Sequence, residues 1–321
     1  MDRWEPGADL CVLKQRAEVL RKIRRFFEER RLLEVETPLI SRFPAVDQHL
    51  EAFKVISEPG APPRFLITSP EYHMKRLLAA GVESIFQLTK AFRRDEAGSR
   101  HNPEFTILEW YRKGWDHWQL MDEIDGLLQT LLHTPPAEYL SYCDAFQRIL
   151  GIDPLQLSLE AFLAVCEQFD LKPPQVLTTK EADRDERLNL LLGMLIEPHL
   201  GMERPLFLHD YPASQANLAR LYPERPELAM RFEVYYKGIE LGNGFCELTD
   251  ADFQEQRFHL ENAARVRAGK EKLAIDHRFL NALQAGMPDC AGVAMGVDRI
   301  VMLCLGIENF DQVTAFSWPR A

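Results

Sequence analysis

Residues 91–111 read AFRRDEAGSRHNPEFTILEWY, and this stretch gives the first indication of the fold. Two β-rich runs, 84–92 and 106–111, flank its polar loop, as in two neighbouring strands. Side chains alternate between the two faces of a strand. One face of the second strand would carry Phe105, Ile107, Glu109 and Tyr111. Such a wall suits a flat base at one end and an amine at the other, although a charged hairpin tip over a half-buried strand is the simpler alternative.

A second stretch, residues 231–248, reads RFEVYYKGIELGNGFCEL and predicts a β-hairpin. If Lys237-Gly238 form a two-residue turn, Tyr235 pairs with Glu240, and Glu233 lies diagonal to Glu240 on the same face. Diagonal neighbours lie about 7 to 8 Å apart. Two carboxylates at that spacing suit one hard cation shared with substrate phosphates, which predicts a Mg²⁺-ATP site. The alternative is a pair of acids on an exposed strand face.

A third stretch, residues 291–306, reads AGVAMGVDRIVMLCLG and predicts a strand that runs into a helix. Arg299 falls near the start of that helix, where a guanidinium group can bind an anion such as phosphate. A close-packed corner between strand and helix would explain the same pattern.

The remaining patterns predict an α+β fold. Apolar residues recur at helical spacing over residues 9–31, and a strand-like run at 33–40 is interrupted by Pro38. Ser69-Pro70-Glu71 follows a further strand signal and favours a helix start, with Ser69 as N-cap and Pro70 as first helical residue. Residues 119–200 are mainly helical in pattern. We therefore expect one domain over residues 1–321, with a helical insertion at about 119–200.

Composition narrows the class of protein. The chain has 321 residues, 46% of them hydrophobic, and a net charge of -11. Ample apolar content predicts a packed core, whereas the acidic balance argues against extensive contact with nucleic acid, despite a basic cluster at 21–31. The sequence contains neither an export signal nor about 18 consecutive apolar residues, so we expect a cytoplasmic protein. Six scattered cysteines suggest neither a disulfide framework nor a zinc site.

Together the three stretches resemble the signature motifs of class II aminoacyl-tRNA synthetases, with residues 35–39 as the first motif, 92–111 as the second and 292–299 as the third. The resemblance extends over residues 8–318 and is strongest to lysyl-tRNA synthetases. Because we expect no anticodon-binding domain, the chain is most similar to the stand-alone paralogues of those enzymes. The resemblance implies an antiparallel β-sheet flanked by helices and a homodimer formed through the first motif and the 9–31 helix.

The same resemblance implies an AMP-forming ligase that uses ATP and Mg²⁺. The paralogues attach (R)-β-lysine to a lysine side chain of translation elongation factor P, so this factor is the implied partner, with no stable nucleic-acid partner and no membrane. The resemblance gives catalytic roles to Arg93, Arg299 and Glu240, with Glu233 and Glu240 as metal ligands. The implied ATP-binding residues are Arg93, Arg94, Asp95, His101, Asn102, Phe105, Glu240, Leu241, Gly296 and Arg299. The implied amino-acid contacts are Ser69, Pro70, Glu71, Glu109, Tyr111, Asn243, Glu247 and Ala294.

Within those roles, Arg93 would bridge the α-phosphate and the substrate carboxylate, Arg299 would bind the γ-phosphate, and Phe105 would stack on adenine. Two positions depart from the lysyl-tRNA synthetase pattern. Arg94-Asp95 replaces the usual Asn-Glu, and the shorter acid weakens the case for an adenine contact. Ala294 replaces glycine, and its methyl group would favour β-lysine over α-lysine.

Two other functions stay open on the sequence alone. The chain could be a shortened lysyl-tRNA synthetase that charges tRNA, although its net charge disfavours that. It could also be a regulator that binds an amino acid without catalysis, although such a protein has no use for the triphosphate-binding residues Arg93, Glu233, Glu240 and Arg299.

Overall fold

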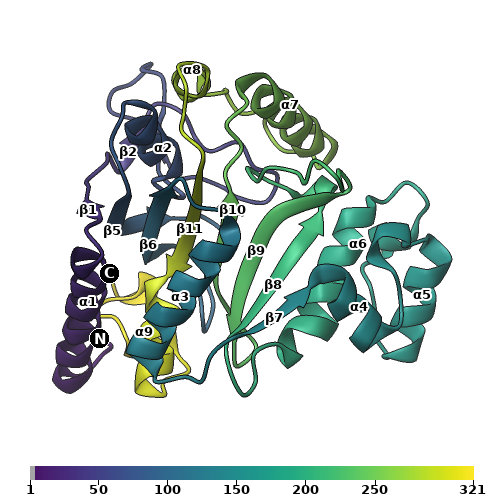
Figure 1. Cartoon of the computed structure of the whole chain (residues 1–321), viewed down its shortest axis with the longest axis horizontal. Coiled ribbons are helices and arrows are strands. Elements are labelled where there is room, and N and C mark those ends of the chain that lie inside the picture. The colour runs from purple at the N-terminus through teal and green to yellow at the C-terminus, as the bar shows by residue number, and fades with distance from the viewer. Residues whose placement is uncertain (1–3) are drawn as a thin grey trace. The chain divides into compact units, whose positions relative to one another are not determined.

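The computed structural model describes residues 4–321, and the chain divides into two compact units. The first unit runs to His133 and resumes at Glu247, and the second comprises Thr134–Cys246. Each unit combines strands with helices (Figure 1), so the fold is α+β, as predicted.

Four strands of the first unit carry the quoted stretch 91–111 and its neighbours. They lie in the order β1 (Leu33–Glu34), β5 (Ile85–Phe92), β6 (Glu104–Lys113) and β11 (Cys290–Gly296). The pairs β5–β6 and β6–β11 are antiparallel, whereas β1 runs parallel to β5. The strand pair expected on both sides of the polar loop is therefore confirmed, and the expectation of a purely antiparallel sheet is corrected at its outer strand.

Six α-helices belong to the described part of the first unit. They are α1 (Leu10–Glu29), α2 (Glu71–Ala79), α3 (His117–Leu132), α7 (Ala251–Arg267), α8 (His277–Gln284) and α9 (Val297–Leu305). Helices α3 and α9 pack on β11 and β6, and α1 packs on α3 and α9, while α2 packs on α8 (Figure 1). A small antiparallel sheet, in the order β2 (Ile40–Ser41), β4 (Arg64–Leu66) and β3 (Lys54–Val55), completes the unit.

Helix α1 shows why the 9–31 pattern folds as predicted. Asp9 caps its N-terminus by accepting a hydrogen bond from the backbone N–H of Val12. The apolar side chains at helical spacing face inward, and Phe27 is fully buried. The Phe27 ring stacks on Phe86 of β5, with ring centroids 4.8 Å apart, and also contacts Trp110 of β6. Aromatic packing thus fixes α1 against the strands that carry the second motif.

The second unit holds the predicted hairpin. Its strands lie in the order β10 (Ile239–Cys246), β9 (Leu228–Tyr236), β8 (Leu206–Pro212) and β7 (Glu138–Ser141), antiparallel except for the pair β7–β8. Lys237 and Gly238 have φ angles of 51° and 66°, as a two-residue type I′ turn requires. Glu240 pairs with Tyr235, and Asn243 pairs with Glu233. The predicted register at the turn is confirmed.

Helices fill the remainder of the second unit. They are α4 (Tyr142–Leu150), α5 (Leu159–Gln168) and α6 (Arg184–Leu191), followed by a π-helical turn at Leu192–Ile196. Their apolar faces form one core with side chains of β7, β8 and β9. The region 119–200, expected to be mainly helical, therefore contains these helices and most of α3, together with the short strand β7.

The start of α2 differs by one residue from the prediction. The helix begins at Glu71, and Pro70 is its N-cap residue. Ser69 still accepts a hydrogen bond from the backbone N–H of Glu71, over 3.1 Å. The polar tip therefore forms as expected, which places Ser69 and Glu71 at the start of the helix.

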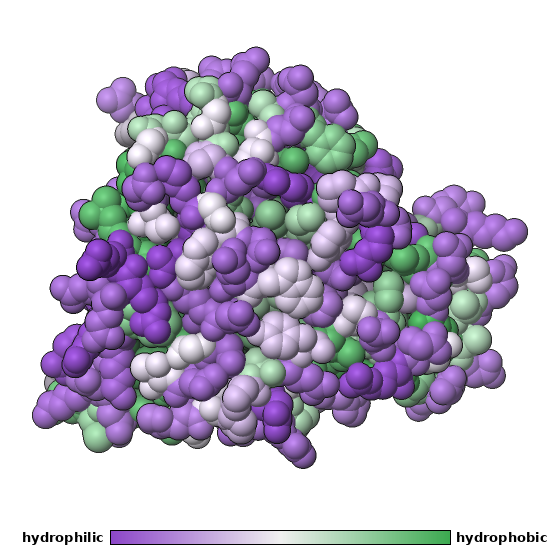
Figure 2. All heavy atoms as spheres, in the orientation of Figure 1, coloured by the Kyte–Doolittle hydropathy of each residue, from purple (hydrophilic) through white to green (hydrophobic). Residues whose placement is uncertain are grey.

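Hydrophilic side chains cover most of the face drawn in Figure 2, and apolar side chains form small, separate patches on it. Among residues 4–321, none of the helices has the length and apolar character needed to span a bilayer.

Candidate active site

The central wall of the candidate site is one face of β6. This strand pairs with β5 and β11 without a register shift along its length. The alternation predicted from sequence is therefore confirmed. The face carries Phe105, Ile107, Glu109 and Tyr111.

A group of polar side chains gathers at Glu109, and we call it the carboxylate cluster. Its members are Ser69, Glu71, Lys75, Glu109, Tyr111 and Glu247. Ser69 Oγ donates to Glu109 Oε2 and Tyr111 Oη donates to Glu109 Oε1, each over 2.6 Å. Lys75 Nζ lies 2.6 Å from Glu71 Oε1 and 2.6 Å from Glu247 Oε2. Five expected amino-acid contacts are thus brought together with a lysine that the sequence analysis did not single out.

Burial sets the protonation states in this cluster. Burial and, to a smaller extent, the charge of Glu71 raise the pKa of Glu109 from 4.5 to about 8, against the opposing effects of Ser69, Tyr111 and Lys75. Burial by itself would lower the pKa of Lys75, but the charges of Glu247 and Glu71 outweigh it and hold this pKa above its ordinary value. At neutral pH, Glu109 is therefore largely protonated, whereas Lys75 is charged.

Strand β11, which pairs with β6, lies next to the carboxylate cluster. Gly292 pairs with Tyr111, and a Cβ atom at Gly292 would collide with the Tyr111 ring and the Glu247 carboxylate. Glycine is needed here because the two side chains occupy the space of its missing methyl group. Ala294 pairs directly with Glu109, so the alanine that departs from the lysyl-tRNA synthetase pattern lies beside the central carboxylate.

Phe105 and Arg93 form the other end of the β6 wall. The Arg93 guanidinium carbon lies 5.0 Å from the centroid of the Phe105 ring, and Arg93 Nη1 lies 3.4 Å from Glu96 Oε1. Arg93 Nε is buried and makes no hydrogen bond within the described chain. A buried N–H without an acceptor is costly in a folded protein, so this group is available to an anionic ligand.

A second guanidinium group comes from the start of α9. Arg299 Nη2 lies 2.5 Å from His101 Nε2. Because arginine only donates, this ring nitrogen of His101 acts as the acceptor, which assigns a neutral imidazole protonated at Nδ1. Burial lowers the pKa of His101, and the charge of Arg299 lowers it further, in keeping with this assignment. Gly296 ends β11 and caps α9, which presents Arg299 on the first turn as expected.

Asn102, Arg94 and Asp95 make structural contacts. Asn102 donates to the backbone carbonyl of Glu104 and accepts from the backbone N–H of Trp318. Arg94 pairs with Asp95 over 3.3 Å and lies 4.0 Å from Glu51. Because these contacts use hydrogen-bonding atoms of Asn102, Arg94 and Asp95, fewer of those atoms are available to a nucleotide than the resemblance implies.

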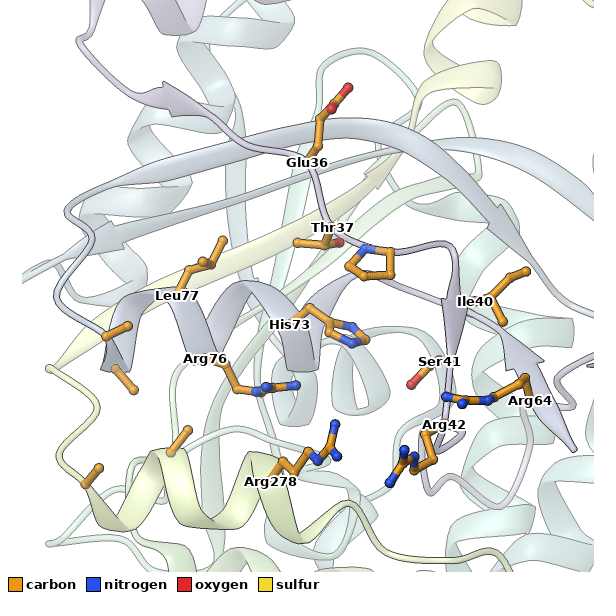
Figure 3. Close-up of a pocket in the computed structure, with 15 residues that line it drawn as sticks. Glu36, Thr37, Ile40, Ser41, Arg42, Arg64, His73, Arg76, Leu77 and Arg278 are labelled. Carbon is orange, nitrogen blue, oxygen red and sulfur yellow. The ribbon is translucent and has the colours of Figure 1, made fainter. Parts of the chain in front are cut away.

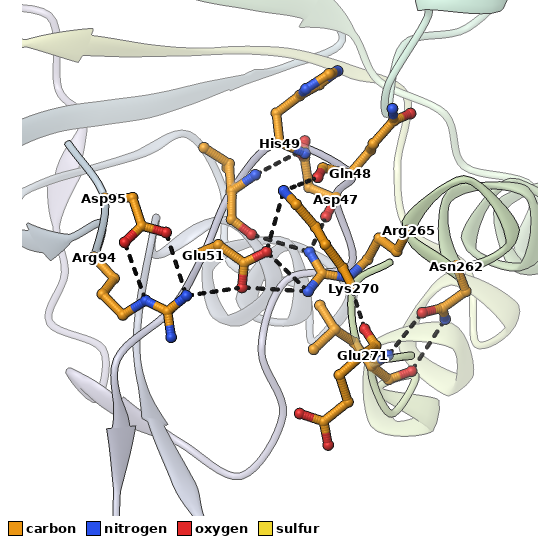
Figure 4. Close-up of polar contacts among 12 residues, drawn as sticks. Asp47, Gln48, His49, Glu51, Arg94, Asp95, Asn262, Arg265, Lys270 and Glu271 are labelled. Carbon is orange, nitrogen blue, oxygen red and sulfur yellow. Dashed lines mark hydrogen bonds and ion pairs between the residues drawn. The ribbon is translucent and has the colours of Figure 1, made fainter. Parts of the chain in front are cut away.

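Figure 4 shows the network around Glu51 that includes Arg94. Glu51 also pairs with Arg265 and Lys270, over 3.1 and 3.3 Å. The network therefore ties the end of β5 to the loop at 47–51 and to the end of α7. Arg94 is therefore held by ion pairs with Asp95 and Glu51.

In the second unit, Glu233 is already held by several donors. Tyr211 Oη and Tyr235 Oη donate to Glu233 Oε2 over 2.6 and 2.5 Å, and Arg231 Nη2 lies 2.5 Å from Glu233 Oε1. Glu240 lies opposite Tyr235, next to a β-bulge that separates it from Gly242. Leu241 and Asn243 belong to the same strand, and Asn243 accepts a hydrogen bond from Arg231 Nε over 3.3 Å.

The carboxylate oxygens of Glu233 and Glu240 are ligands of the type that Mg²⁺ prefers. A carboxylate offers about four lone-pair positions, and three donors on Glu233 leave one for a cation. Glu240 is half-buried and is the better candidate ligand, because the positive charge of Arg231 next to Glu233 opposes a dication there. Glu233 and Glu240 therefore remain a predicted metal pair.

Sequence reasoning missed two charged residues that build the site. Lys75 follows Glu71 at the i,i+4 spacing of a helical ion pair, and that spacing was the available signal. Asp298 accepts from the backbone N–H of Thr106 and pairs with Arg16 of α1 over 2.6 Å. No local pattern indicates Asp298, because Arg16 and Thr106 lie far from it in the chain.

Comparisons with known proteins agree with the geometry. The sequence profile of the family described as tRNA synthetases class II (D, K and N) matches residues 10–320. Proteins named elongation factor P–(R)-β-lysine ligase from Klebsiella pneumoniae subsp. pneumoniae, Klebsiella pneumoniae strain 342 and Salmonella paratyphi B are each 50% identical to this chain. Each of these alignments covers 322 residues, 99% of this chain and 98% of the relative.

Proposed function

This chain belongs to the class II tRNA synthetase family of the D, K and N type, and on that basis we propose that it is an ATP-dependent ligase for (R)-β-lysine. In this proposal the enzyme activates (R)-β-lysine as an adenylate and transfers the acyl group to a lysine side chain of translation elongation factor P. The name shared by relatives at 50% identity over nearly the full length supports the transfer step, and membership of the synthetase family supports the ATP-dependent activation.

The carboxylate cluster is the observation that carries the choice of substrate. Glu71, Glu109 and Glu247 bring three negative charges when ionised, and Lys75 brings one positive charge. When all three carboxylates are ionised, the cluster therefore has a net charge of −2, which matches the two ammonium groups of a lysine-like amino acid. Buried charges need partners, so a diamine is favoured over a substrate with one amine.

The adenylation step uses the other end of the β6 wall. A carboxylate oxygen of the amino acid attacks the α-phosphorus of ATP, forming the mixed anhydride and releasing pyrophosphate. Arg93 is placed to neutralise charge on the α-phosphate and the entering carboxylate, with Phe105 beneath the adenine and Arg299 on the departing phosphates. The unpaired Arg93 Nε supports this role, since a ligand would supply its missing acceptor.

The transfer step follows from the adenylate. The neutral amine of the acceptor lysine attacks the carbonyl carbon, an amide bond forms, and AMP leaves with the bonding electron pair. The amine releases its proton, and the phosphate of AMP is a sufficient acceptor, so no additional base is required.

Mg²⁺ belongs to the proposal as a cofactor. We assign its binding to Glu240, with the free lone-pair position of Glu233 as a second contact. When bound, the cation neutralises charge on the phosphates of ATP. The assignment is supported by donor type and by the hairpin register that places both carboxylates on one face.

Assembly and location complete the proposal. We propose a homodimer formed through α1 and the first motif, which is supported by exposed apolar side chains at Leu33, Leu39 and Ile40. We also propose that the enzyme acts in the cytoplasm. The six cysteines are all free thiols, in keeping with a reducing compartment.

Isotope exchange between pyrophosphate and ATP tests the activation step. Exchange should depend on (R)-β-lysine and should fail with an analogue in which a methyl group replaces the terminal ammonium group. Comparable exchange with that analogue would show that the carboxylate cluster does not select a diamine.

A further inference from the structure

A cavity of about 740 Å³ lies in the first unit, apart from the carboxylate cluster. It is bordered by α2, by α8 and by the small sheet of β2 and β4 (Figure 3). Its walls include the apolar side chains of Pro38, Ile40 and Leu77. A cavity of this size can hold a small organic molecule.

Four guanidinium groups line this cavity. They belong to Arg42, Arg64, Arg76 and Arg278. Figure 3 shows all four reaching toward the same space, two from helices and two from the strand region. Within residues 4–321, none of these guanidinium groups has a hydrogen bond or ion pair with another residue. Glu36 is the one acidic residue among the described residues of the lining, and its carboxylate points away from them in Figure 3.

Two of these arginines lie at the same end of the β2–β4 pairing. Strand β2 pairs with β4 through Ile40–Leu66 and Ser41–Phe65, so Arg42 directly follows, and Arg64 directly precedes, the residues of the last pair. Like charges held near each other repel. An anion between them would remove that repulsion.

Helices α2 and α8 each contribute one further arginine to the cavity. On α2, His73 and Arg76 share one helical face, and on α8 Arg278 lies in the first turn. A cation in the first turn of a helix is opposed by the helix dipole. Arg278 therefore faces the charge of Arg76, while the nearby carboxylate of Asp276 accepts hydrogen bonds from the backbone N–H groups of Arg278 and Phe279 as the N-cap of α8.

The pKa of His73, which lines the cavity, depends on the charges around it. Burial lowers the pKa of His73, and the positive charge of Arg76 lowers it further, while Asp276 acts in the opposite direction. Binding of an anion beside Arg76 would raise this pKa, which provides a local signal.

We propose that this cavity binds a compact multivalent oxyanion, of the phosphate or polycarboxylate type. In a protein of net charge -11, four unpaired guanidinium groups around one concave site select for an anion. Guanidinium groups bind phosphate and carboxylate through paired, charge-assisted hydrogen bonds. The apolar walls leave room for the organic part of such a ligand. The site is independent of the proposed ligase activity, because it shares no residue with the carboxylate cluster.

Titration with inorganic phosphate and with citrate tests the proposal. The readouts are the pKa of His73, from NMR spectra assigned with His73→Gln, and the thermal midpoint. The test variant is Arg76→Gln/Arg278→Gln. The matched control is Lys172→Gln/Arg204→Gln, which removes two exposed cations of the second unit. Arg299→Gln serves as a control for anion binding at the proposed ATP site.

At least one anion should raise the pKa of His73 and the thermal midpoint in the wild type, the matched control and Arg299→Gln. Affinity should fall about tenfold or more in the double variant, because two charge-assisted contacts are lost. A preference for phosphate or for citrate would identify the type of ligand.

Three results would overturn the proposal. One is the absence of any response to millimolar phosphate or citrate. Another is an equal response in the double variant, or its loss in Arg299→Gln, either of which would place the anion elsewhere. The third is dissociation of the proposed dimer, seen as a lower sedimentation coefficient, in the double variant without anion. Pro38 and Ile40 of the cavity wall adjoin the proposed dimer surface, and this result would show that Arg76 and Arg278 serve that interface instead of an anion.

Discussion

Glu109 is the residue whose chemistry most constrains the proposed activity. Its buried carboxyl group lies on one face of β6 and accepts hydrogen bonds from Ser69 and Tyr111. With a pKa of about 8, it holds a proton at neutral pH that a substrate ammonium group must displace. Substrate binding and proton release are therefore linked.

The first prediction concerns the pH dependence of this linkage. Below pH 8, binding of (R)-β-lysine should release a proton from Glu109, so affinity should rise with pH and level off near pH 8. Calorimetry in buffers of different ionisation enthalpy measures the released proton. In Glu109→Gln the proton release should disappear. Undiminished release in that variant would assign the titration to another group.

Stability gives an independent check on the same pKa. The folded protein holds a proton on Glu109 between its ordinary pKa of 4.5 and about 8, whereas the unfolded chain has lost it. This contribution to stability is therefore present at low pH and decreases as pH rises through that window. The decrease should be smaller in Glu109→Gln.

Lys75 provides the second prediction at this scale. Lys75→Met removes the cation between the half-buried Glu71 and the buried Glu247, so both carboxylates lose their ion pair with Lys75. Breaking a buried pair on one side costs about 3 to 5 kcal/mol. Urea denaturation measures the loss. Lys54→Met is the matched control, because the ion pair of Lys54 with Glu271 is exposed and contributes about 1 kcal/mol or less. Equal losses in both variants would contradict the structural role of Lys75.

At the scale of elements, the pairing of β6 with β11 determines what lies next to each catalytic group. Gly292 faces Tyr111 and Ala294 faces Glu109 without a register shift. Strand alternation was enough to predict the face of β6, and the Lys237-Gly238 turn was enough to predict the hairpin register. Contacts between distant segments were not predictable in this way. Asn102 bonds to Trp318 across 216 residues of sequence, which no local pattern indicates.

The third prediction tests the β11 register. Ala294→Gly should relax the preference for (R)-β-lysine over α-lysine, because one methyl group beside a carboxylate changes discrimination by about 1 to 3 kcal/mol. The measurement is the ratio of kcat/KM for the two amino acids. Ala291→Gly is the control, since Ala291 lies on the other face of the same strand, opposite Arg112. An unchanged ratio in Ala294→Gly would refute the steric explanation.

The fourth prediction belongs to the β9–β10 hairpin. Glu240→Gln should abolish adenylate formation and leave the fold intact, because an amide has nearly the same shape but lacks the charge that attracts Mg²⁺. Pyrophosphate exchange and circular dichroism measure the two effects. Glu227→Gln, an exposed position in the same unit, should retain exchange. Near wild-type exchange in Glu240→Gln at ordinary Mg²⁺ concentration would exclude the metal assignment.

At the scale of the whole molecule, charge and family lead to the same expectation. The net charge of -11 resists a polyanion such as tRNA, whereas a folded protein that presents one lysine needs only a local docking surface. Membership of the synthetase family and the motifs that carry it could be predicted from sequence, because the motif residues are contiguous. The arginine-lined cavity could not, because its guanidinium groups come from four separate segments.

The choice of acceptor tests the central claim most directly. Purified enzyme receives ATP, Mg²⁺ and (R)-β-lysine together with both elongation factor P and lysine tRNA, and each acceptor is then analysed by mass spectrometry. We predict a mass gain of one β-lysyl group on a single lysine of elongation factor P and no acylated tRNA. Efficient charging of tRNA with no mass gain on the factor would contradict the proposed function.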